Sequence, residues 1–248
     1  MNVFNSILEK RKAGKKMLAV LIDPDKSSPA ECIKIAEIAT EAEVDLFFVG
    51  SSILMNDSFE SCVDILKRSS SIPVVLFPGS IMQISPSADA ILFLSLISGR
   101  NADLLIGKHV LSAPLIKKNN LEPISTGYML IDSGAPTSVS YMSNTFPIPH
   151  DKNDIAVCTA MAGEMLGMKM IYMDSGSGAR FPISTSMVSE VKKNTEAPLI
   201  VGGGIKTADK AAELCNAGAD VIVIGNAIEK NPEIISEIAT AIHAFYAK

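Results

Sequence analysis

At residues 198–206 the chain reads PLIVGGGIK, and at residues 221–226 it reads VIVIGN. Each stretch is a short β-branched run that stops at glycine, and residues 207–218 between them have the pattern of a helix. The pair predicts two consecutive strand–helix units of a parallel sheet. In a (β/α)8 barrel the loops after the last two strands direct bare backbone N–H groups toward a phosphate, and glycine lets the anion approach. Glycine clusters also form tight turns that bind nothing, but two in succession favour a phosphate site.

The same alternation of strand-like and helix-like segments extends through the 248 residues. It predicts an α/β fold with a parallel sheet in one domain, residues 1–248. The expected strands are residues 17–22, 45–49, 74–77, 90–94, 127–131, 169–173, 199–201 and 221–224. The expected helices are residues 29–41, 59–68, 102–118, 155–166, 184–194, 207–217 and 232–246, after an amphipathic helix within residues 1–17. Eight strands predict a closed (β/α)8 TIM barrel.

Two segments interrupt the repeat. The third connection, residues 78–89, is too short and too rich in Pro and Ser for a full helix. Residues 132–153 are polar and contain three prolines, which predicts an ordered excursion or lid over the carboxyl end of the barrel. The barrel is therefore expected to be modified, with its third helix missing or replaced.

Composition limits the classes of partner. A net charge of −5 gives no basic field for nucleic acid, so small molecules are the expected partners. The four cysteines lack C-x-x-C spacing, which predicts neither a zinc site nor a disulfide framework and fits a reducing cytoplasm. No apolar run approaches membrane-spanning length, although 48% hydrophobic residues with 12 Met leave room for peripheral contact with a membrane.

Polar residues follow several of the predicted strands, at the end of a barrel where active sites form. Asp23 ends the first strand, and a carboxylate there can bind a hard cation beside substrate phosphates. Asp25 has the pattern of a turn or helix cap instead. Ser51 and Ser52 follow the second strand; a hydroxyl there can bind Mg²⁺ or phosphate, and Ser52 can equally be a helix N-cap.

The sixth strand ends in YMDSGSG, residues 172–178, an acid followed by small residues and glycines. Backbone N–H groups there are expected to face the Gly203 and Gly225 loops and form one anion pocket, although a flexible loop could have the same composition. His109 and His243 fall within predicted helices, where packing or surface roles are expected, and His150 lies in the polar excursion.

Taken together, LIDPDK at 21–26, VGSS at 49–52, YMDSGSG at 172–178, VGGGIK at 201–206 and GN at 225–226 resemble the geranylgeranylglyceryl phosphate synthase family. The resemblance runs through nearly the whole chain in order. It implies a modified TIM barrel without the third helix. It also implies transfer of a prenyl group, with geranylgeranyl diphosphate the expected donor, to the 3-hydroxyl of sn-glycerol 1-phosphate with Mg²⁺, and a homo-oligomer.

The resemblance also implies roles for individual residues. Asp23 and Ser52 would hold the Mg²⁺, and Asp174, with Tyr172 beside it, would act on the glycerol hydroxyl. Glycerol 1-phosphate would be bound by Tyr172, Met173, Asp174, Ser175, Gly176, Ser177, Gly178, Gly203, Gly204, Gly225 and Asn226. The family usually has Glu where this chain has Asp174, and Ser51 replaces the second glycine of its Gly-Gly-Ser/Thr element.

Two rival functions remain open from the residues alone. A phosphosugar isomerase or lyase on the same barrel could use Asp23 and Asp174 as its acid and base. A noncatalytic barrel could bind a phosphorylated ligand through the glycine loops. Release of diphosphate separates prenyl transfer from both.

Overall fold

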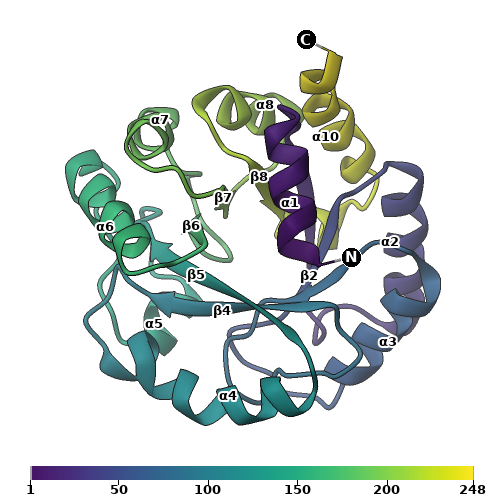
Figure 1. Ribbon diagram of the computed structural model, residues 1–248. Helices are drawn as coiled ribbons and strands as arrows, with labels where there is room; N and C mark the ends of the chain where they lie inside the picture. Colours follow the sequence, from purple (N-terminus) through teal and green to yellow (C-terminus); the bar gives the residue numbers. More distant parts are fainter. Residues whose placement is uncertain (1, 248) are drawn as a thin grey trace.

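A closed barrel of eight parallel strands forms the centre of the molecule, and the strands follow one another in chain order (Figure 1). The structure is a computed structural model that describes residues 2–247, and side chains through residue 245. The strands are β1 (Met17–Ile22), β2 (Leu46–Val49), β3 (Val74–Leu76), β4 (Ala90–Leu96), β5 (Glu122–Leu130), β6 (Met170–Asp174), β7 (Leu199–Gly202) and β8 (Val221–Ile224). This arrangement confirms the predicted α/β barrel.

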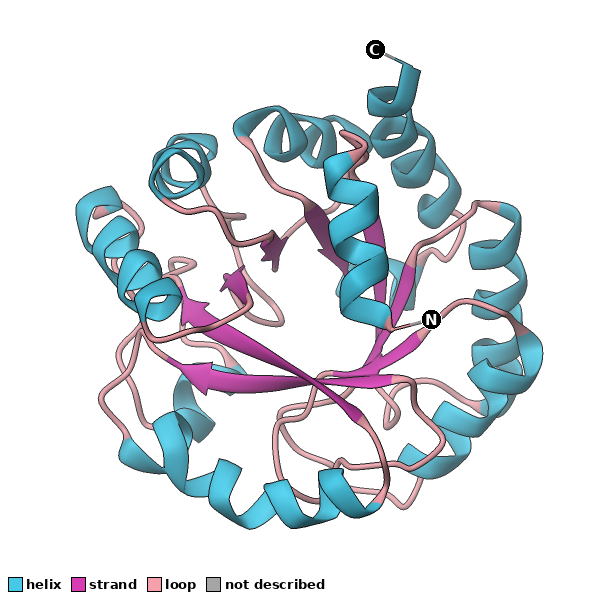
Figure 2. Cartoon of the chain, viewed as in Figure 1, coloured by secondary structure: helices cyan, strands magenta, loops and turns pink. Residues whose placement is uncertain are grey.

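Helices surround the strands on the outside of the barrel (Figure 2). They are α1 (Val3–Lys12), α2 (Pro29–Glu41), α3 (Phe59–Ser69), the π-helical turn η1 (Asp103–Gly107), α4 (Lys108–Lys118), α5 (Ser138–Ser143), α6 (Asn153–Met165), α7 (Thr185–Asn194), α8 (Ala208–Ala217), α9 (Asn226–Lys230), α10 (Ile234–His243) and the 3₁₀ turn η2 (Ala244–Ala247). Within residues 2–247, every helix is too short or too polar to cross a bilayer.

Several elements differ from the sequence expectation, among them β5 and α9. Strand β5 begins at Glu122 rather than at residue 127, because Glu122 through Tyr128 pair in register with Ala90 through Leu96 of β4. That pairing outweighs the polar and proline-containing sequence at the start of the strand. The short helix α9 was not expected, since five residues after a glycine carry little periodic signal.

Successive side chains along each strand point alternately into the barrel and out toward the helices, which creates two apolar layers. The inward layer includes Met17, Phe48, Leu92 and Ile200, and the outward layer packs under the helices. A strand that is buried on both faces must be apolar throughout, which explains the continuous β-branched runs in the sequence.

Helix α1 closes the amino-terminal end of the barrel (Figure 1). Its buried Val3 and Ile7 belong to the cluster inside the barrel. Glu122 accepts hydrogen bonds from the backbone N–H groups of Val3 at 2.7 Å and Phe4 at 3.1 Å, at the start of the helix. Lys10 Nζ lies 2.6 Å from Asp45, which also accepts from the backbone N–H of Leu18. Helix α1 therefore covers the amino-terminal end of the barrel.

Asp220 joins three segments at the same end. Its carboxylate is 4% exposed and accepts from the backbone N–H of Leu199 at 2.9 Å and from Lys192 Nζ at 2.7 Å. Arg11 Nε of α1 lies 3.4 Å away. The group therefore connects α1 and α7 to the start of β7.

Replacing this carboxylate should destabilise the fold without touching the carboxyl end. Asp220→Ala leaves a buried N–H without an acceptor and Lys192 without its counter-charge, so we expect a loss of about 3 kcal/mol in the free energy of unfolding. Urea denaturation measures it. Glu213→Ala, which removes only the exposed partner of Lys210, should cost less than about 0.5 kcal/mol and serves as the control. Equal losses in the two variants would contradict the assignment.

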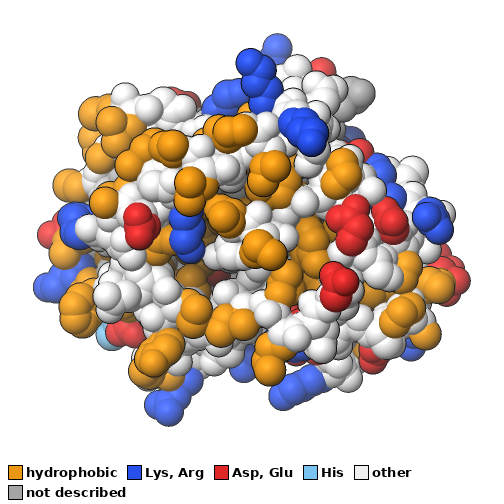
Figure 3. Space-filling view, turned by 90° about the horizontal axis from the view of Figure 1, so that it is seen from below, with side chains coloured by type: hydrophobic (Ala, Val, Ile, Leu, Met, Phe, Trp, Pro, Cys, Tyr) orange, Lys and Arg blue, Asp and Glu red, His pale blue; other side chains and the backbone are white. Residues whose placement is uncertain are grey.

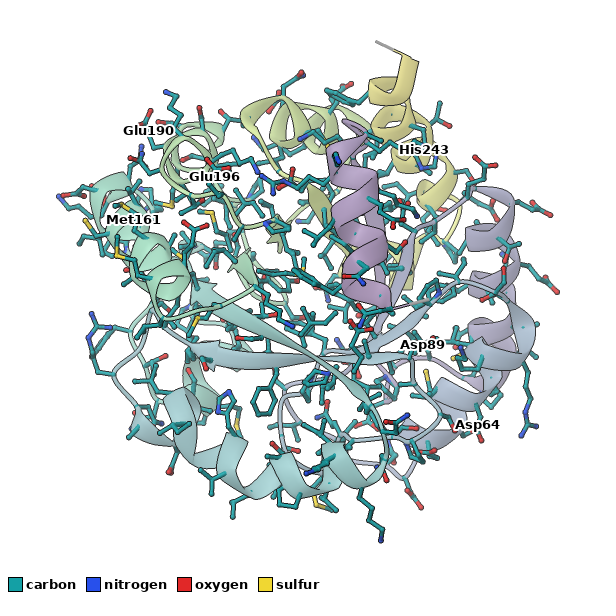
Figure 4. All side chains as sticks on the ribbon, viewed as in Figure 1. Asp64, Asp89, Met161, Glu190, Glu196 and His243 are labelled. Carbon is teal, nitrogen blue, oxygen red and sulfur yellow. The ribbon has the colours of Figure 1, made fainter. Side chains whose placement is uncertain are left out.

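The connection from β3 to β4 contains no helix, as predicted. Two side chains hold it in place instead. Gln83, 1% exposed, accepts from the backbone N–H groups of Ser51 and Gly79 and donates to the carbonyl of Ser51 at 2.7 Å. Asp89, labelled in Figure 4, accepts from Lys67 Nζ of α3 and from the backbone N–H of Val74. The barrel wall is left without a covering helix at this position.

Residues 132–153 form the predicted ordered excursion. It contains α5, and Ile148 forms a parallel bridge with Ile131 at the end of β5. Thr137 is buried and caps α5 through its hydroxyl. A side chain added at Gly176 would meet that hydroxyl at 2.8 Å, so the excursion packs directly against the loop after β6.

Candidate functional site

The loop after β1 places a carboxylate beside a hydroxyl. Asp23 lies just past the end of β1, and its Oδ2 accepts a hydrogen bond from Ser51 Oγ at 3.2 Å. Lys26 Nζ lies 3.3 Å from the same oxygen and 3.2 Å from Glu229 of α9. Asn226 Nδ2 donates to the same oxygen of Glu229, at 3.4 Å. The polar network therefore extends from the first strand to the loop after the last.

Asp25 has a structural role. Its carboxylate accepts hydrogen bonds from the backbone N–H groups of Met55 and Asn56 and from Ser58 Oγ. The hydrogen bond from Met55, together with the others, holds the pKa of this carboxyl below its ordinary value. The turn interpretation of Asp25 is thus supported: it orders the loop before α3.

Ser51 and Ser52 point to different neighbours. Ser51 Oγ contacts Asp23, as described, whereas Ser52 lines an apolar cavity together with Pro78 and Gly79. The assignment of Ser52 as a metal ligand stays a prediction. The sequence predicted for Ser51 only a hydroxyl that can bind Mg²⁺ or phosphate, and its hydrogen bond to Asp23 depends on the pairing of β1 with β2.

An aromatic cluster fills the carboxyl end of the barrel interior. Tyr172 of β6 stacks on Phe77 with ring centroids 5.2 Å apart, and Tyr128 of β5 meets both rings edge-on at 5.4 and 5.8 Å. A side chain at Gly202 would come within 2.7 Å of the Tyr172 hydroxyl, so glycine is needed there. Burial raises the pKa of both tyrosines, and both stay protonated at neutral pH.

Asp174 is a buried carboxylate with two donors. It ends β6, is 7% exposed, and accepts from Tyr128 OH at 2.6 Å and from the backbone N–H of Gly176 at 2.8 Å. Burial raises the pKa of Asp174, and the two hydrogen bonds oppose that rise. A carboxyl with a raised pKa is suited to accept a proton from a substrate. Tyr128 was missed from the sequence, because only the pairing of β5 with β6 brings it to Asp174.

The hydrogen bond from Tyr128 stabilises the ionised carboxylate of Asp174. Tyr128→Phe removes this bond and should therefore raise the pKa of Asp174 further. A carbon-13 NMR titration of labelled aspartate measures the change. The pKa of Asp174 is higher in the folded protein than in the unfolded chain. Its contribution to the free energy of unfolding is therefore complete below the unfolded pKa and is lost as pH rises through the folded pKa. The variant should lose more stability across that window. Tyr141→Phe removes the hydroxyl of a residue that is 84% exposed and should change neither quantity. An unchanged pKa of Asp174 in Tyr128→Phe would contradict the argument.

Three glycine loops meet at the predicted phosphate pocket. Gly203 has φ +84°, and a side chain there would lie 2.7 Å from the backbone nitrogen of Ser175 and 2.8 Å from Asp174 Oδ1. Asn226 Oδ1 accepts from Ser177 Oγ at 3.1 Å and from the N–H of Gly178 at 3.3 Å. The loops after β6, β7 and β8 are therefore in contact, as expected from the sequence.

Ser175 carries a further polar group in this pocket. Its side chain is fully buried, and its hydroxyl makes no hydrogen bond within the part of the chain that the structure describes. Buried hydroxyls in proteins nearly always have a partner. A ligand with polar oxygens would supply one.

An apolar cavity of about 230 Å³ opens where the barrel lacks its third helix. Ser52 and Tyr128 line it from the carboxyl end of the barrel, and His109 and Ser112 line it from α4. Most of the remaining lining is aliphatic, from the 78–84 loop, β4 and α5. The cavity therefore places an apolar space beside the polar residues at the barrel end.

The three histidines take no part in the polar site. His109 is buried against Phe93 at 4.5 Å and shares a hydrogen bond with Ser95, and His243 belongs to α10. His150 is exposed and lies 3.8 Å from Asp132. These positions support the packing and surface roles expected for them.

The donor atoms near Asp23 fit a hard cation. Carboxylate and hydroxyl oxygens are ligands that Mg²⁺ accepts, and one or two carboxylates suffice when substrate phosphates supply the rest. Within residues 2–247 no group of three or more His, Cys, Asp or Glu side chains could enclose a metal ion. A metal at Asp23 would therefore depend on phosphate oxygens of a bound substrate.

Comparison with known proteins agrees with this geometry. A family model described as the PcrB family matches residues 7–242. The chain is 59% identical to the geranylgeranylglyceryl phosphate synthase of Chitinophaga pinensis, over 98% of this chain and 96% of that protein. It is 50% identical to the synthase of Spirosoma linguale, over 94% of each.

A solved structure extends the likeness to three dimensions. The (S)-3-O-geranylgeranylglyceryl phosphate synthase of Thermoplasma acidophilum, in complex with its substrate sn-glycerol-1-phosphate, superposes with a TM-score of 0.92. The two sequences are 33% identical, and the match covers 98% of each chain. The chain therefore belongs to the PcrB family, the family of the geranylgeranylglyceryl phosphate synthases, and is a prenyltransferase.

Proposed function

We propose that the protein joins a prenyl diphosphate, with geranylgeranyl diphosphate the expected donor, to the 3-hydroxyl of sn-glycerol 1-phosphate in an Mg²⁺-dependent reaction. The observation that carries the proposal is the position of Tyr128, which lines the apolar cavity and whose hydroxyl donates to Asp174. One residue thus joins a space for an apolar chain to a buried carboxylate beside the glycine loops. The isomerase, lyase and noncatalytic alternatives do not fit membership in a prenyltransferase family.

The acceptor would bind at the glycine loops. Gly203 and Gly204 have φ values of +84° and +69°, a left-handed backbone without side chains that lets an anion approach the N–H groups of the loop. The buried Ser175 hydroxyl adds a donor that has no partner among residues 2–247. The Thermoplasma synthase binds sn-glycerol-1-phosphate, and its high structural similarity supports the same acceptor here.

Asp174 would orient the 3-hydroxyl of the acceptor and take its proton. In the balanced reaction the bond between C1 of the prenyl chain and the diphosphate oxygen breaks, and the ether bond from C1 to the glycerol oxygen forms. The hydroxyl proton passes to Asp174, and diphosphate leaves with the electron pair. Tyr128 and the Gly176 N–H hold the carboxylate in place, which compensates for a side chain one methylene shorter than the usual Glu.

Asp23 and Ser52 would hold the cation, with the Ser51 hydroxyl fixing one oxygen of Asp23. When bound, Mg²⁺ neutralises the negative charge that develops on the departing diphosphate. Lys26, 3.3 Å from Asp23, adds a fixed positive charge at the same place.

The apolar cavity would hold the prenyl tail, and its size would limit the donor. Ser112 is buried and lines the cavity from α4. Ser112→Phe adds bulk to a space of about 230 Å³, so we expect turnover with geranylgeranyl diphosphate to fall about tenfold or more relative to a shorter donor. Ser186→Phe, on a helix that does not line the cavity, is the control. An unchanged donor preference would place the tail elsewhere.

A radiolabelled transfer assay tests the whole proposal. Purified protein, Mg²⁺ and labelled glycerol 1-phosphate are incubated with prenyl diphosphates of increasing length, and butanol-extractable label is counted. Label in the organic phase supports ether formation, and the best donor gives the chain length. Absence of label with every donor, from folded protein that binds glycerol 1-phosphate, would refute it. We also expect a homo-oligomer, which light scattering of the purified protein measures.

A further inference from the structure

The side chain of Gln83 binds the backbone just beyond the end of β2. Its amide oxygen accepts hydrogen bonds from the N–H of Ser51 at 3.1 Å and from the N–H of Gly79 at 3.2 Å, and its amide nitrogen donates to the carbonyl of Ser51 at 2.7 Å. Two of these positions require an acceptor and the third requires a donor, which fixes the orientation of the amide. We call these three hydrogen bonds the Gln83 clamp.

The Gln83 clamp continues the backbone pairing at a position where the sheet has ended. The registers of β2 with β1 and with β3 both stop at Val49. The N–H of Gly50 still donates to the carbonyl of Ile22 at 3.2 Å. Ser51 is the next residue along the chain, and the Gln83 amide supplies the donor and the acceptor that a further strand residue would supply. One side chain therefore fixes Ser51 through both of its backbone polar groups.

The loops that Gln83 joins are also in direct backbone contact. A Cβ at Gly79 would lie 2.2 Å from the carbonyl oxygen of Ser51, so only glycine permits this approach. The backbone of Gln83 is held as well, because its N–H donates to the carbonyl of Ser80 at 3.1 Å. The amide is thus attached to a fixed turn and has little freedom to leave its partners.

The Gln83 clamp lies where the barrel has no third helix. Loops occupy the space between α3 and α4 in Figure 1, and Figure 3 views the molecule from below that side. Hydrophobic side chains make up much of the surface in Figure 3, with charged side chains scattered among them. Gln83 is 1% exposed, so water has little access to its hydrogen bonds. Loss of the amide would leave the N–H groups of Ser51 and Gly79 buried without an acceptor.

The hydroxyls of Ser51 and Ser52 take their positions from this backbone. Ser51 Oγ lies 3.2 Å from Asp23 Oδ2 and 2.8 Å from the carbonyl oxygen of Ile53. A hydroxyl has one proton, which these two acceptors share, so the contact with Asp23 depends on where the backbone holds Ser51. Ser52 follows directly and lines the cavity. A shift of the segment would move both hydroxyls relative to Asp23.

We propose that Gln83 is a positioning residue for the part of the site that binds the donor. Its amide holds the segment after β2 so that the Ser52 hydroxyl can bind the cation together with Asp23. This inference rests on the proposed function, in which Asp23 and Ser52 hold Mg²⁺ beside the diphosphate. Groups that orient the ligands of a metal ion contribute to its affinity without touching it.

The loop that carries Gln83 contacts both ends of the proposed donor site. Ile81 and Ile84 line the apolar cavity, whereas Gln83 is not part of that lining and points to Ser51 instead. The loop in place of the third helix therefore forms a wall for the prenyl tail with its isoleucines and fixes the place of the diphosphate with its amide. The acceptor loops after β6, β7 and β8 have no part in the Gln83 clamp.

Calorimetric titration of inorganic diphosphate, with and without Mg²⁺, tests the role apart from turnover. Gln83→Met keeps the length of the side chain and removes the three hydrogen bonds. We expect the Mg²⁺-dependent increase in diphosphate affinity to fall about tenfold or more. The affinity for glycerol 1-phosphate should be unchanged, because its proposed loops lie outside the Gln83 clamp. An unchanged Mg²⁺-dependent increase in Gln83→Met would overturn the inference.

Asp220→Ala is the matched control for stability. It removes hydrogen bonds of another buried polar group, at the amino-terminal end of the barrel. Both variants should unfold at a lower urea concentration than the wild-type protein, but only Gln83→Met should lose the Mg²⁺-dependent affinity. Equal losses of affinity would show that any destabilised barrel binds poorly, and would contradict a positioning role.

A double-variant cycle shows whether Gln83 acts through Ser52. Ser52→Ala removes the proposed ligand, so its combination with Gln83→Met should weaken binding by less than the product of the two single losses. Independent losses that multiply would contradict the inference. If Ser52→Ala loses the Mg²⁺-dependent affinity and Gln83→Met retains it, the cation site stands and only the role of Gln83 is wrong. If Ser52→Ala binds as the wild-type protein does, the proposed cation site is wrong and this inference falls with it.

Hydrogen exchange of the wild-type protein gives a test that does not depend on the folding of a variant. The N–H groups of Ser51 and Gly79 lie in loops, where exchange with solvent is ordinarily fast. The Gln83 clamp should protect both, and we expect NMR to detect slow exchange at the two positions. Fast exchange at both would show that the amide does not hold the segment in solution, and would overturn the inference.

Discussion

Gly203→Val should abolish binding of glycerol 1-phosphate. The φ of Gly203 is +84°, and a Cβ built there would lie 2.7 Å from the nitrogen of Ser175, 2.8 Å from Asp174 Oδ1 and 2.9 Å from the nitrogen of Gly176. Two of these neighbours are backbone atoms and the third belongs to a carboxylate held by hydrogen bonds, so none can move aside alone. The loop after β7 must shift away from the loop after β6. We expect the Kd for glycerol 1-phosphate to rise at least about a hundredfold, measured by calorimetry.

The control for Gly203→Val is Gly167→Val. Gly167 has φ +87°, and a Cβ there would meet nothing within 4 Å. Both variants carry the strain of a β-branched residue in the left-handed region, about 1–3 kcal/mol of stability. Only Gly203→Val adds the collision, so only it should lose binding. Unchanged affinity in a folded Gly203→Val would place the phosphate at another position.

Asp23→Asn should remove Mg²⁺-dependent transfer while the barrel stays folded. The amide keeps the shape of the carboxylate but carries no charge, and Lys26 keeps Glu229 as its partner. With no cluster of acidic side chains in residues 2–247 to replace it, the loss should reach about a thousandfold in kcat/KM. Calorimetric titration of diphosphate with and without Mg²⁺ gives a second readout, in which the metal-dependent increase in affinity should disappear.

Asp25→Asn is the matched control, the same change two residues along the chain. Asp25 orders the 55–58 loop through three hydrogen bonds, so the variant should be less stable yet keep transfer within about tenfold of wild type. Because the folded pKa of Asp25 is lowered, its stabilisation is present above the unfolded pKa and is lost as pH falls through the folded pKa. The Asp25→Asn variant should not show this loss of stability at low pH. Near-normal turnover in Asp23→Asn, or a larger defect in Asp25→Asn, would exchange the roles of the two carboxylates.

The fold could be predicted from local patterns in the sequence. The β-branched runs at residues 199–201 and 221–224 became β7 and β8, because strands buried on both faces must be apolar throughout. The short, proline-containing third connection predicted a missing helix, and the structure has none between Leu76 and Ala90. Strand-terminal residues such as Asp23 and Asp174 were found by position alone, since parallel strands of a barrel end at one rim.

Contacts between distant segments were not available from those patterns. Tyr128 looks like an ordinary strand residue until the pairing of β5 with β6 puts its hydroxyl on Asp174, 46 positions along the chain. Ser51 and Lys26 gained their role only when Asp23 and Glu229 were placed beside them. The start of β5 at Glu122 likewise depended on its register with β4.

The sequence by itself therefore determined the barrel, the missing helix and the rim positions of the acids and glycines. Periodicity and glycine placement are local properties, and they encode which residues face the core and where each strand ends. The tertiary structure decided which side chains meet at that rim and that an apolar cavity lies beside them. Those features depend on register and on packing between elements far apart in the chain, which no local pattern specifies.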